Sequence, residues 1–487
     1  MINPTHEISD SLLTDLYQFT MAYGYWKAGK AEQEAVFNLY FRKHPFGGGF
    51  TIACGLSSVI EYLNSYTFQD SDLDYLGTLT GSDGQPLFDK DFLVYLQNMS
   101  FQCDIEAVPE GTVVFPNEPM LRIRGPILQC QLLETPLLNL LNFESLVATK
   151  AARMRLVAPQ DSLLEFGLRR AQGPDGGMTA SRAAYVGGFD ATSNVSAGKR
   201  YGIPVKGTHA HSWVMSFDSE LEAFQTYAQY LPANTTLLVD TYNTIQGIKH
   251  AILVGNELRK RGHDLAGIRL DSGDLAYLSI EARQLLDAAG FDQTAIVASN
   301  DLDEYIIQSL KLQGAKINVW GVGTKLVTAF DQPALGGVFK LAAIRQPDGS
   351  WYYTLKLSEQ TLKISTPGIQ QVRRYFDANG FVADMIYNQE NMPESSATMI
   401  DPYDFTRQRQ FDSSFAWEDL LQPIFKQGIP CYTSPSIHEV RARVQQQLAN
   451  LHPGIKRLVN PHTYPVGLEA KLFDLKTELI LKLREAK

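Results

Sequence analysis

The sequence predicts an α/β protein in which an irregular (β/α) barrel domain is flanked by an N-terminal α+β module of antiparallel strands and a C-terminal α+β module. Short apolar runs alternate with helix-length segments through residues 131–345, a rhythm typical of parallel sheets built from strand–helix units. Hairpin turns separate the apolar runs on either side, which favours antiparallel strands there. A chain of 487 residues has room for about three domains.

We assign residues 1–130 to the N-terminal module. A helix-like segment at 12–26 opens it, and turns such as Gly47-Gly48-Gly49 punctuate the rest. The expected strands are the apolar runs at 36–41, 50–54, 105–108, 112–115 and 120–124. These runs lack helix-length spacers in most places, so we expect antiparallel pairing rather than strand–helix units.

We assign residues 131–345 to the barrel. Its first helix is expected to have Thr135 as the cap and Pro136 at its first position. The expected strands are the apolar runs at 162–166, 191–192, 203–205, 236–239, 267–270, 295–297, 317–320 and 337–339. This many strand–helix units indicate a barrel, in which catalytic groups lie where strands end and loops begin.

We assign residues 346–487 to the C-terminal module. Pro347-Asp348-Gly349 and Asn379-Gly380 predict hairpins, since these residue types favour tight turns. The amphipathic pattern of residues 468–483 predicts a helix near the end of the chain.

The composition is that of an ordinary folded protein, with 44% hydrophobic and 20% charged residues. The net charge of -10 argues against nonspecific binding to nucleic acid or anionic membranes. The first ten residues lack the pattern of a signal peptide, and no segment has transmembrane character. The four cysteines form no CxxC pair, which disfavours structural zinc and disulfides. We expect a cytoplasmic protein that binds neither nucleic acid nor membranes.

The most informative motif is Gly207-Thr208-His209-Ala210-His211-Ser212, directly after the apolar run at 203–205. Side chains two apart on a strand point the same way, so His209 and His211 are expected to face one spot. Such a pair indicates a metal site, a general base or a nucleophile. The alternative is one histidine hydrogen-bonded within the fold and one exposed histidine.

Charged side chains stand at the ends of other expected strands, namely Arg169, Asp240, Arg269 and Asp271. Two inward guanidiniums are costly unless an anion neutralises them, and their planar fork suits a carboxylate or a phosphate. The alternative is that the arginines pair with Asp240, Asp271 or Glu165. Asp240 and Asp271 are also candidate Mg²⁺ ligands, through water.

A glycine loop, Gly321-Val322-Gly323-Thr324, follows the seventh expected strand of the barrel. Barrels often build a phosphate site at this position. Glycines expose backbone N–H groups, and Thr324 adds a hydroxyl donor. The mouth of the barrel is therefore expected to take a substrate that carries phosphates and a carboxylate.

The chain resembles the nicotinate phosphoribosyltransferase family along nearly its whole length. In the N-terminal module the resemblance rests on LLTDLYQ at 12–18 and FRKHPFGG at 41–48. In the barrel it rests on EFGLRRAQG at 165–173, GGFD at 187–190, GTHAHS at 207–212, RLDSGD at 269–274 and GVGT at 321–324. Together, in this order, these motifs are highly specific.

The resemblance implies a reaction in NAD salvage. Nicotinate and phosphoribosyl pyrophosphate would give nicotinate mononucleotide and pyrophosphate, with Mg²⁺ as the metal. ATP would be a co-substrate whose hydrolysis is coupled through a phosphohistidine. The family also implies a homodimer in which the N-terminal module helps to complete the active site.

The resemblance also implies roles for individual residues. His211 matches the phosphorylated position, whereas His209 falls on a variable one, and we expect Asp271 to be catalytic as well. The residues expected to bind nicotinate are Tyr17, Arg169, Thr208 and Arg269. The residues expected to bind phosphoribosyl pyrophosphate are Gly321, Gly323 and Thr324. Asp240 and Asp271 remain the candidates for the metal.

The main alternative is a metal-dependent barrel hydrolase with His209 and His211 as zinc ligands. Such an enzyme needs further ligands at later strand ends, whereas His250 and His263 fall in helix-like or loop segments. Among transferases, specificity for nicotinamide or quinolinate is the nearest competitor, and paired arginines favour an acid over an amide.

Overall fold

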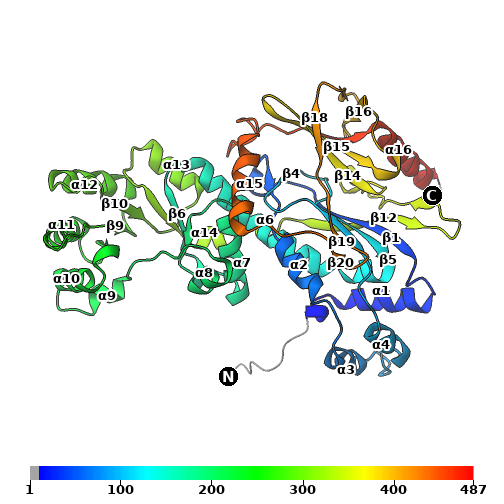
Figure 1. The fold of residues 1–487 in the computed structure, drawn as a ribbon, viewed down its shortest axis with the longest axis horizontal. Helices are drawn as coiled ribbons and strands as arrows, with labels where there is room; N and C mark the ends of the chain where they lie inside the picture. The colour runs from blue at the N-terminus through cyan, green and yellow to red at the C-terminus, as the bar shows by residue number, and fades with distance from the viewer. Residues whose placement is uncertain (1–9, 486–487) are drawn as a thin grey trace. The chain divides into compact units, whose positions relative to one another are not determined.

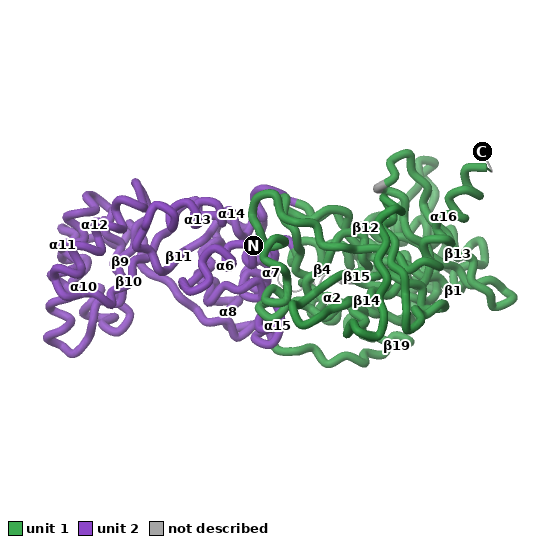
Figure 2. Tube along the Cα trace, turned by 90° about the horizontal axis from the view of Figure 1, so that it is seen from above, with its two compact units in different colours: residues 1–145, 334–436, 445–487 green, residues 146–333, 437–444 purple. Residues whose placement is uncertain are grey.

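The computed structural model describes residues 10–485, which form two compact units (Figure 2). Within this range, unit 1 holds the residues up to 145, residues 334–436 and those from 445 on, and unit 2 holds residues 146–333 and 437–444. Residues 1–9, in which we expect no signal peptide, lie outside the described residues. Two helices have residues in both units, α6 (Glu134–Val157) and α15 (Ile437–Ala449).

The larger sheet of unit 1 is antiparallel and has the order β13-β12-β1-β5-β3-β19-β20. Figure 1 labels β12, β1, β5, β19 and β20 of this sheet. Its strands are β1 (Glu34–Phe41), β3 (Asp104–Ala107), β5 (Leu121–Pro126), β12 (Gly337–Arg345), β13 (Trp351–Tyr353), β19 (Gln422–Lys426) and β20 (Ile429–Pro430). The short pair β2 (Thr51–Ile52) and β4 (Val113–Val114) lies outside this sheet. The strands expected in the N-terminal module are thus confirmed, and two of them also pair with later segments of the chain, β1 with β12 and β3 with β19.

The second sheet of unit 1 has the order β17-β16-β21-β15-β14-β18. Its strands are β14 (Gln370–Asp377), β15 (Gly380–Asn388), β16 (Ala397–Ile400), β17 (Gln408–Phe411), β18 (Ala416–Asp419) and β21 (Val466–Glu469). The predicted hairpin at Asn379-Gly380 joins β14 to β15. Gly380 has a φ of 115°, and a Cβ there would lie 2.2 Å from the Asn450 carbonyl oxygen, so the turn requires glycine.

A buried ion pair lies within this second sheet. Arg374 on β14 and Asp384 on β15 are both fully buried and hydrogen-bonded. The remaining guanidinium donors reach the Val113 carbonyl and the Gln447 side chain, at 2.9 and 3.0 Å. Because removal of one charge leaves the other buried and unpaired, a single substitution at either residue is expected to lower the free energy of unfolding strongly.

Among the described residues, six α-helices lie wholly within unit 1. They are α1 (Leu16–Lys27), α2 (Leu56–Asn64), α3 (Asp70–Thr78), α4 (Lys90–Gln97), α5 (Ile127–Leu132) and α16 (Ala470–Glu485). Phe19 of α1 packs in an apolar cluster with Phe88 and Phe92. The terminal helix predicted at 468–483 is confirmed as α16. No helix within residues 10–485 is long and apolar enough to cross a bilayer.

Unit 2 is a parallel sheet covered by helices, as the strand–helix rhythm predicted. The sheet order is β7-β6-β11-β10-β9-β8. Its strands are β6 (Ser162–Glu165), β7 (Ala191–Thr192), β8 (Thr236–Leu238), β9 (Gly267–Leu270), β10 (Ala295–Ala298) and β11 (Val319–Val322). Its helices are α7 (Gly173–Val186), α8 (Val195–Tyr201), α9 (His211–Met215), α10 (Glu220–Tyr230), α11 (Thr244–Lys260), α12 (Leu275–Ala288), α13 (Glu304–Leu312) and α14 (Thr324–Val327).

The segment 205–209 connects the two edges of this sheet. Val205 forms an isolated parallel bridge with Thr192 of the edge strand β7. At the other edge, the Leu238 N–H of β8 donates to His209 Nε2 at 3.2 Å. The segment thus contacts one edge strand through its backbone and the other through a side chain, and the six strands form an incomplete barrel rather than a closed one. The run at 203–205, expected as a full strand, supplies only this bridge.

One expected barrel strand belongs elsewhere. The run at 337–339 was predicted as the last barrel strand, but it opens β12, which pairs with β1 in the antiparallel sheet of unit 1. The preceding helix α14 has only four residues, so the strand–helix rhythm breaks before this run. The Phe37 and Phe339 rings stack at 4.9 Å across the pair, and cross-strand aromatic contacts of this kind stabilise antiparallel sheets.

Candidate functional site

The candidate site lies at the carboxyl ends of β8, β9 and β10 in unit 2. Asp240 follows β8, Arg269 lies near the end of β9 with Asp271 just after it, and Ser299 follows β10. The strands are parallel neighbours, so their carboxyl ends share one edge of the sheet. Loops at this edge are the usual place for ligand sites in α/β proteins.

Arg269 is the centre of this cluster. Its Nε donates to Ser299 Oγ at 2.8 Å, Nη1 to Thr208 Oγ1 at 3.0 Å and Nη2 to Asp271 Oδ1 at 2.9 Å. The side chain is 16% exposed, so these partners fix the plane of the guanidinium. The sequence left open whether Arg269 pairs with a carboxylate, and the structure shows the pair with Asp271.

Asp271 connects Arg269 to His211. Burial acts to raise the pKa of Asp271, but hydrogen bonds from Ser299 and Arg269 and the nearby His211 outweigh it and hold the pKa below its usual range. Its Oδ2 lies 3.7 Å from His211 Nε2. A carboxylate that stays ionised beside an imidazole orients the ring and stabilises positive charge on it.

His211 is the first residue of α9 and is held from two sides. Its Nδ1 lies 3.1 Å from the Thr241 hydroxyl, and Asp271 faces Nε2. The ring is 40% exposed, so a ligand at the strand ends can reach it. This partly exposed imidazole with two fixed neighbours has the arrangement expected of a nucleophile.

His209 has a different environment. Its ring is 7% exposed and packs against Tyr227 and Phe224, while Nε2 accepts the Leu238 N–H. Burial, with a smaller contribution from the positive charge of Arg269, lowers the pKa of His209 to about 4. The ring is therefore neutral and structural near pH 7.

The expectation that the two histidines face one spot is wrong. Residues 205–209 form no strand beyond one bridge, and His211 begins a helix, so the alternation of strand side chains does not apply. His209 Nε2 is already used by a backbone N–H. Among the described residues, the one group of three or more potential ligands close enough for an ion is Cys54, Glu110 and Glu144 in unit 1. The geometry does not support a zinc site on His209 and His211.

Asp240 offers the best metal ligand at this edge of the sheet. Its Oδ2 accepts from the Asp271 N–H at 2.8 Å and from the Ser272 hydroxyl at 2.7 Å. Its Oδ1 is buried without a hydrogen-bond partner among the described residues. A buried unpaired carboxylate oxygen is unusual, and hard oxygen donors are the ligands that Mg²⁺ prefers. These residues therefore fit the expected cation.

The glycine loop lies on β11, which neighbours β10 and β6 in the sheet. Gly321 is in the strand, and Gly323 precedes Thr324, the first residue of α14. A Cβ at Gly321 would lie 2.6 Å from the Phe166 ring, so glycine makes room for that ring. The Phe166 ring centroid lies 5.7 Å from the Arg269 guanidinium carbon.

Besides the glycine loop, two further predicted residues, Arg169 and Tyr17, lie outside this cluster. Arg169 lies in the short 3₁₀ turn after β6, is exposed, and has no recorded hydrogen bond or ion pair within residues 10–485. Strands β6 and β9 are three places apart in the sheet, about 14 Å along it at the usual spacing, so the two arginines are not brought into contact. Tyr17 is 47% exposed on α1 of unit 1.

The sequence did not assign roles to Phe166, Thr241 and Ser299. Phe166 and Ser299 follow strand ends directly and Thr241 lies three residues after the end of β8, and this nearness to strand ends was the available signal. Asn300, next to Ser299, has a φ of 120°. Strained non-glycine backbone is enriched at functional sites, but a sequence does not reveal it.

Three family profiles match most of the chain. The nicotinate phosphoribosyltransferase N-terminal domain matches residues 12–142, the nicotinate phosphoribosyltransferase family matches 162–347, and the C-terminal domain of the same enzymes matches 369–476. The matches cover the barrel and both flanking modules.

Individual relatives agree with the profiles. The chain is 44% identical to nicotinate phosphoribosyltransferase of Bacillus subtilis (strain 168) over 479 residues, 97% of this chain and 96% of the relative. It is 37% identical to the human protein of that name over 527 residues, 96% of each chain. The crystal structure of human nicotinic acid phosphoribosyltransferase superposes with a TM-score of 0.84 at 35% identity, covering 96% of this chain and 100% of that one.

Proposed function

The chain belongs to the nicotinate phosphoribosyltransferase family, and we propose that it joins nicotinate to phosphoribosyl pyrophosphate, releasing pyrophosphate and forming nicotinate mononucleotide for NAD salvage. The observation that carries this proposal is Arg269, held in one plane by Thr208, Ser299 and Asp271 at the ligand edge of a parallel sheet. A fixed guanidinium is the group best suited to orient a planar carboxylate.

Nicotinate recognition follows from the donors that Arg269 keeps. Its guanidinium carries more N–H groups than its three hydrogen bonds use. The free donors bind the nicotinate carboxylate, and the Thr208 hydroxyl fixes the guanidinium plane. The Phe166 ring, 5.7 Å from the Arg269 guanidinium carbon, supplies an apolar surface for the pyridine ring. A neutral amide in place of the carboxylate loses the charge-assisted part of this contact.

The phosphoribosyl substrate binds along the neighbouring strand ends. The Gly323 and Thr324 N–H groups at the start of α14, with the Thr324 hydroxyl, hold the 5′-phosphate. Displacement of pyrophosphate breaks the bond from the ribose carbon to oxygen and forms the bond to the pyridine nitrogen. The step needs positioning and charge stabilisation more than proton transfer.

Asp240 and Asp271 are the residues that would hold Mg²⁺, and the unpaired Asp240 Oδ1 is the main reason. A bound Mg²⁺ would neutralise the charge that develops on the leaving pyrophosphate. Asp240 itself also orders the loop after β9, because it accepts hydrogen bonds from the Asp271 N–H and Ser272 hydroxyl.

ATP is the co-substrate, and His211 is its phosphoryl acceptor. A ring nitrogen attacks the γ-phosphorus of ATP and forms an N–P bond, the bond from that phosphorus to the bridging oxygen breaks, and ADP leaves. The ionised Asp271, 3.7 Å from Nε2, stabilises the positive charge on the ring. The phosphoryl group adds negative charge beside the cluster, which orders the site for transfer. Water later attacks the phosphorus of the phosphohistidine, the N–P bond breaks, and phosphate leaves.

We also propose a homodimer in the cytoplasm. Tyr17 lies in unit 1, exposed on α1, and we propose that the N-terminal module of a second subunit brings it to the nicotinate. The four cysteines are free thiols, which fits a reducing compartment. Mass measured by light scattering tests the dimer directly, and a monomer would overturn it.

The function is tested with the purified protein and three bases. Phosphoribosyl pyrophosphate is supplied with nicotinate, nicotinamide or quinolinate, each with and without ATP and Mg²⁺. Of the three bases, only nicotinate should give a mononucleotide, and ATP should accelerate its formation. Product from nicotinamide or quinolinate instead would overturn the specificity, and no product from any base would overturn the function.

A further inference from the structure

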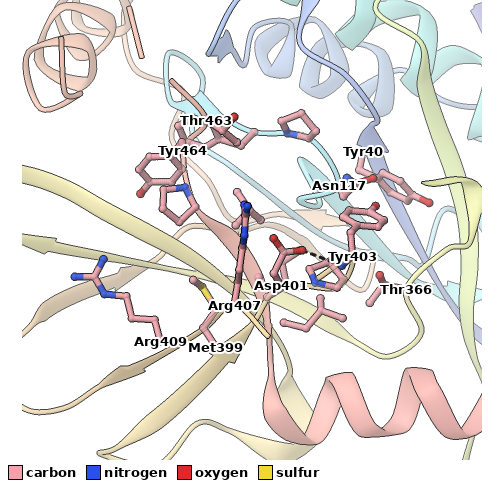
Figure 3. A pocket seen from close by; sticks show the side chains of 18 of the residues that line it. Tyr40, Asn117, Thr366, Met399, Asp401, Tyr403, Arg407, Arg409, Thr463 and Tyr464 are labelled. Carbon is pink, nitrogen blue, oxygen red and sulfur yellow. Dashed lines mark hydrogen bonds between the residues drawn. The ribbon is translucent and has the colours of Figure 1, made fainter. Parts of the chain in front are cut away.

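A separate cavity lies wholly within unit 1 (Figure 3). Its volume is about 790 Å³, which falls within the range of small-molecule sites. Its lining includes residues of the segments 44–49 and 115–117 of the N-terminal module and residues of β15, β16, β21 and α16 of the C-terminal module. None of the residues assigned above to substrate, metal or phosphoryl transfer lines it.

The walls of this cavity are largely apolar and rigid. The Tyr464 ring stacks on the Phe115 ring with centroids 3.9 Å apart, and the Tyr464 hydroxyl donates to Asp384 at 2.8 Å. Ile386 and Leu468 are buried and face the same space. Tightly packed aromatic and aliphatic walls suit a ring or short hydrocarbon body.

One buried cation lines the cavity. Lys476 of α16 is 8% exposed, and its Nζ donates to the Thr366 hydroxyl at 3.1 Å. No carboxylate lies within ion-pair distance of this ammonium in residues 10–485. Burial lowers its pKa to about 8, so most of the lysine stays charged at pH 7. A buried ammonium with a single hydroxyl partner is costly unless an anion joins it.

Gln370 provides a complementary acceptor. It is 1% exposed, and its amide nitrogen donates to the Thr366 carbonyl at 2.6 Å. Its Oε1 is buried and has no hydrogen-bond partner in the part of the chain that the structure describes. Native proteins rarely leave such an oxygen unpaired. Lys476 and Gln370 therefore offer spare donors and a spare acceptor around one apolar space.

The surrounding charges are mostly positive. Arg407 and Arg409 of the loop and strand at 401–411 also line the cavity (Figure 3), although Arg407 pairs with Asp404 at 3.1 Å and is exposed. One carboxylate, Asp401, lines it as well. That carboxylate already accepts from the Tyr403 and Asp404 N–H groups at 2.8 and 3.2 Å. The balance favours an anionic ligand.

We propose that this cavity in unit 1 binds a small organic anion, a ring or hydrocarbon body with one carboxylate or phosphate and one hydrogen-bond donor. The anionic group of the ligand accepts hydrogen bonds from the Lys476 ammonium and the Thr366 hydroxyl. The donor group of the ligand donates to Gln370 Oε1, and the ring or hydrocarbon body packs against Tyr464 and Phe115. Carboxylate and phosphate share the chemistry that Lys476 recognises, so the test must separate them.

The test is a thermal-shift titration of the full chain with three probes. They are inorganic phosphate, 3-hydroxyphenyl phosphate and 3-hydroxybenzoate, and both organic probes carry an anionic group and a hydroxyl donor. At least one organic probe should raise the Tm of the wild type in a saturable way, and 3-hydroxyphenyl phosphate should act at lower concentration than inorganic phosphate. The better of the two organic probes identifies phosphate or carboxylate as the preferred group. No saturable shift with either organic probe, or equal shifts with the two phosphates, would overturn the proposal.

Two variants test whether the probe binds at Lys476. Lys476→Met keeps the apolar stem of the side chain and removes the charge, and it should lower the affinity for the effective probe by about tenfold or more. Because it removes a buried charge, its Tm without probe should not fall, which shows that it folds. Lys482→Met, an exposed position on the same helix, should bind the probe as the wild type does. Equal affinity for the probe in Lys476→Met and the wild type would overturn the proposal.

Discussion

Replacing Arg269 with lysine keeps the positive charge and removes the planar fork. In the structure three different nitrogens of Arg269 donate at 2.8–3.0 Å to Ser299, Thr208 and Asp271. A lysine side chain has a single nitrogen, so it cannot keep these partners and hold a nicotinate carboxylate in the same geometry. The substitution therefore tests orientation separately from charge.

The expected loss can be worked from the contacts. A hydrogen bond to a charged group contributes about 1.5–3 kcal/mol, and each 1.36 kcal/mol or so is a factor of about ten in rate. Losing one such bond to the carboxylate lowers kcat/KM for nicotinate by about 10- to 150-fold. Because an amide makes no charge-assisted bond, the preference for nicotinate over nicotinamide should shrink as well.

The assay is steady-state formation of nicotinate mononucleotide at varied nicotinate concentration. Arg259→Lys is the matched control, since Arg259 pairs with Asp264 on the surface, where the side chains are 40% and 75% exposed. Such pairs contribute little, so this control should keep the wild-type kcat/KM. Thermal unfolding checks that both variants fold. Wild-type kcat/KM in Arg269→Lys would refute the role of Arg269.

Four further predictions concern other residues. His211→Ala should abolish both labelling by γ-labelled ATP and ATP stimulation while leaving slow ATP-independent transfer, and a variant that still takes up label would move the phosphoryl acceptor elsewhere. Asp240→Asn should raise the Mg²⁺ concentration for half-maximal activity by about tenfold or more, and an unchanged requirement would remove Asp240 from the metal site. The pKa of His209 is about 4 in the folded protein, against 6.5 as its ordinary value. The unfolded chain therefore binds this proton first as the pH falls, and about 3 kcal/mol of stability is lost between pH 6.5 and 4. Urea unfolding at pH 7 and 4.5 should show a smaller loss for His209→Gln, and equal losses would contradict a buried neutral ring. Arg374→Met should cost about 3–5 kcal/mol because Asp384 stays buried without its partner, and an unchanged urea midpoint would argue against that pairing.

Much of the fold was predictable because its signals are local. Strand–helix alternation predicted the six parallel strands of unit 2, and Asn379-Gly380 predicted the hairpin between β14 and β15. The assignment of β12 failed because strand pairing is non-local. Residues 337–345 carry no sign that β1, some 300 residues earlier, is their partner.

The candidate site was predictable in its residue types and less so in its geometry. Strand-end positions identified Arg269, Asp271 and His211, which the structure places together. The different partners of His209 and His211 depend on where a helix begins and on one backbone N–H, neither of which the sequence displays. The cavity in unit 1 was not anticipated, because its lining comes from segments more than 400 residues apart.

The central claim is that one cluster in unit 2 couples phosphoryl transfer from ATP to nicotinate mononucleotide formation. The most direct test is a single turnover. Enzyme labelled by γ-labelled ATP and freed of nucleotide is mixed with nicotinate and phosphoribosyl pyrophosphate, and label and product are followed together. We predict that label leaves His211 as phosphate while about one equivalent of nicotinate mononucleotide forms per subunit. Mononucleotide formation with the label retained, or an enzyme that never takes up label, would contradict the coupling.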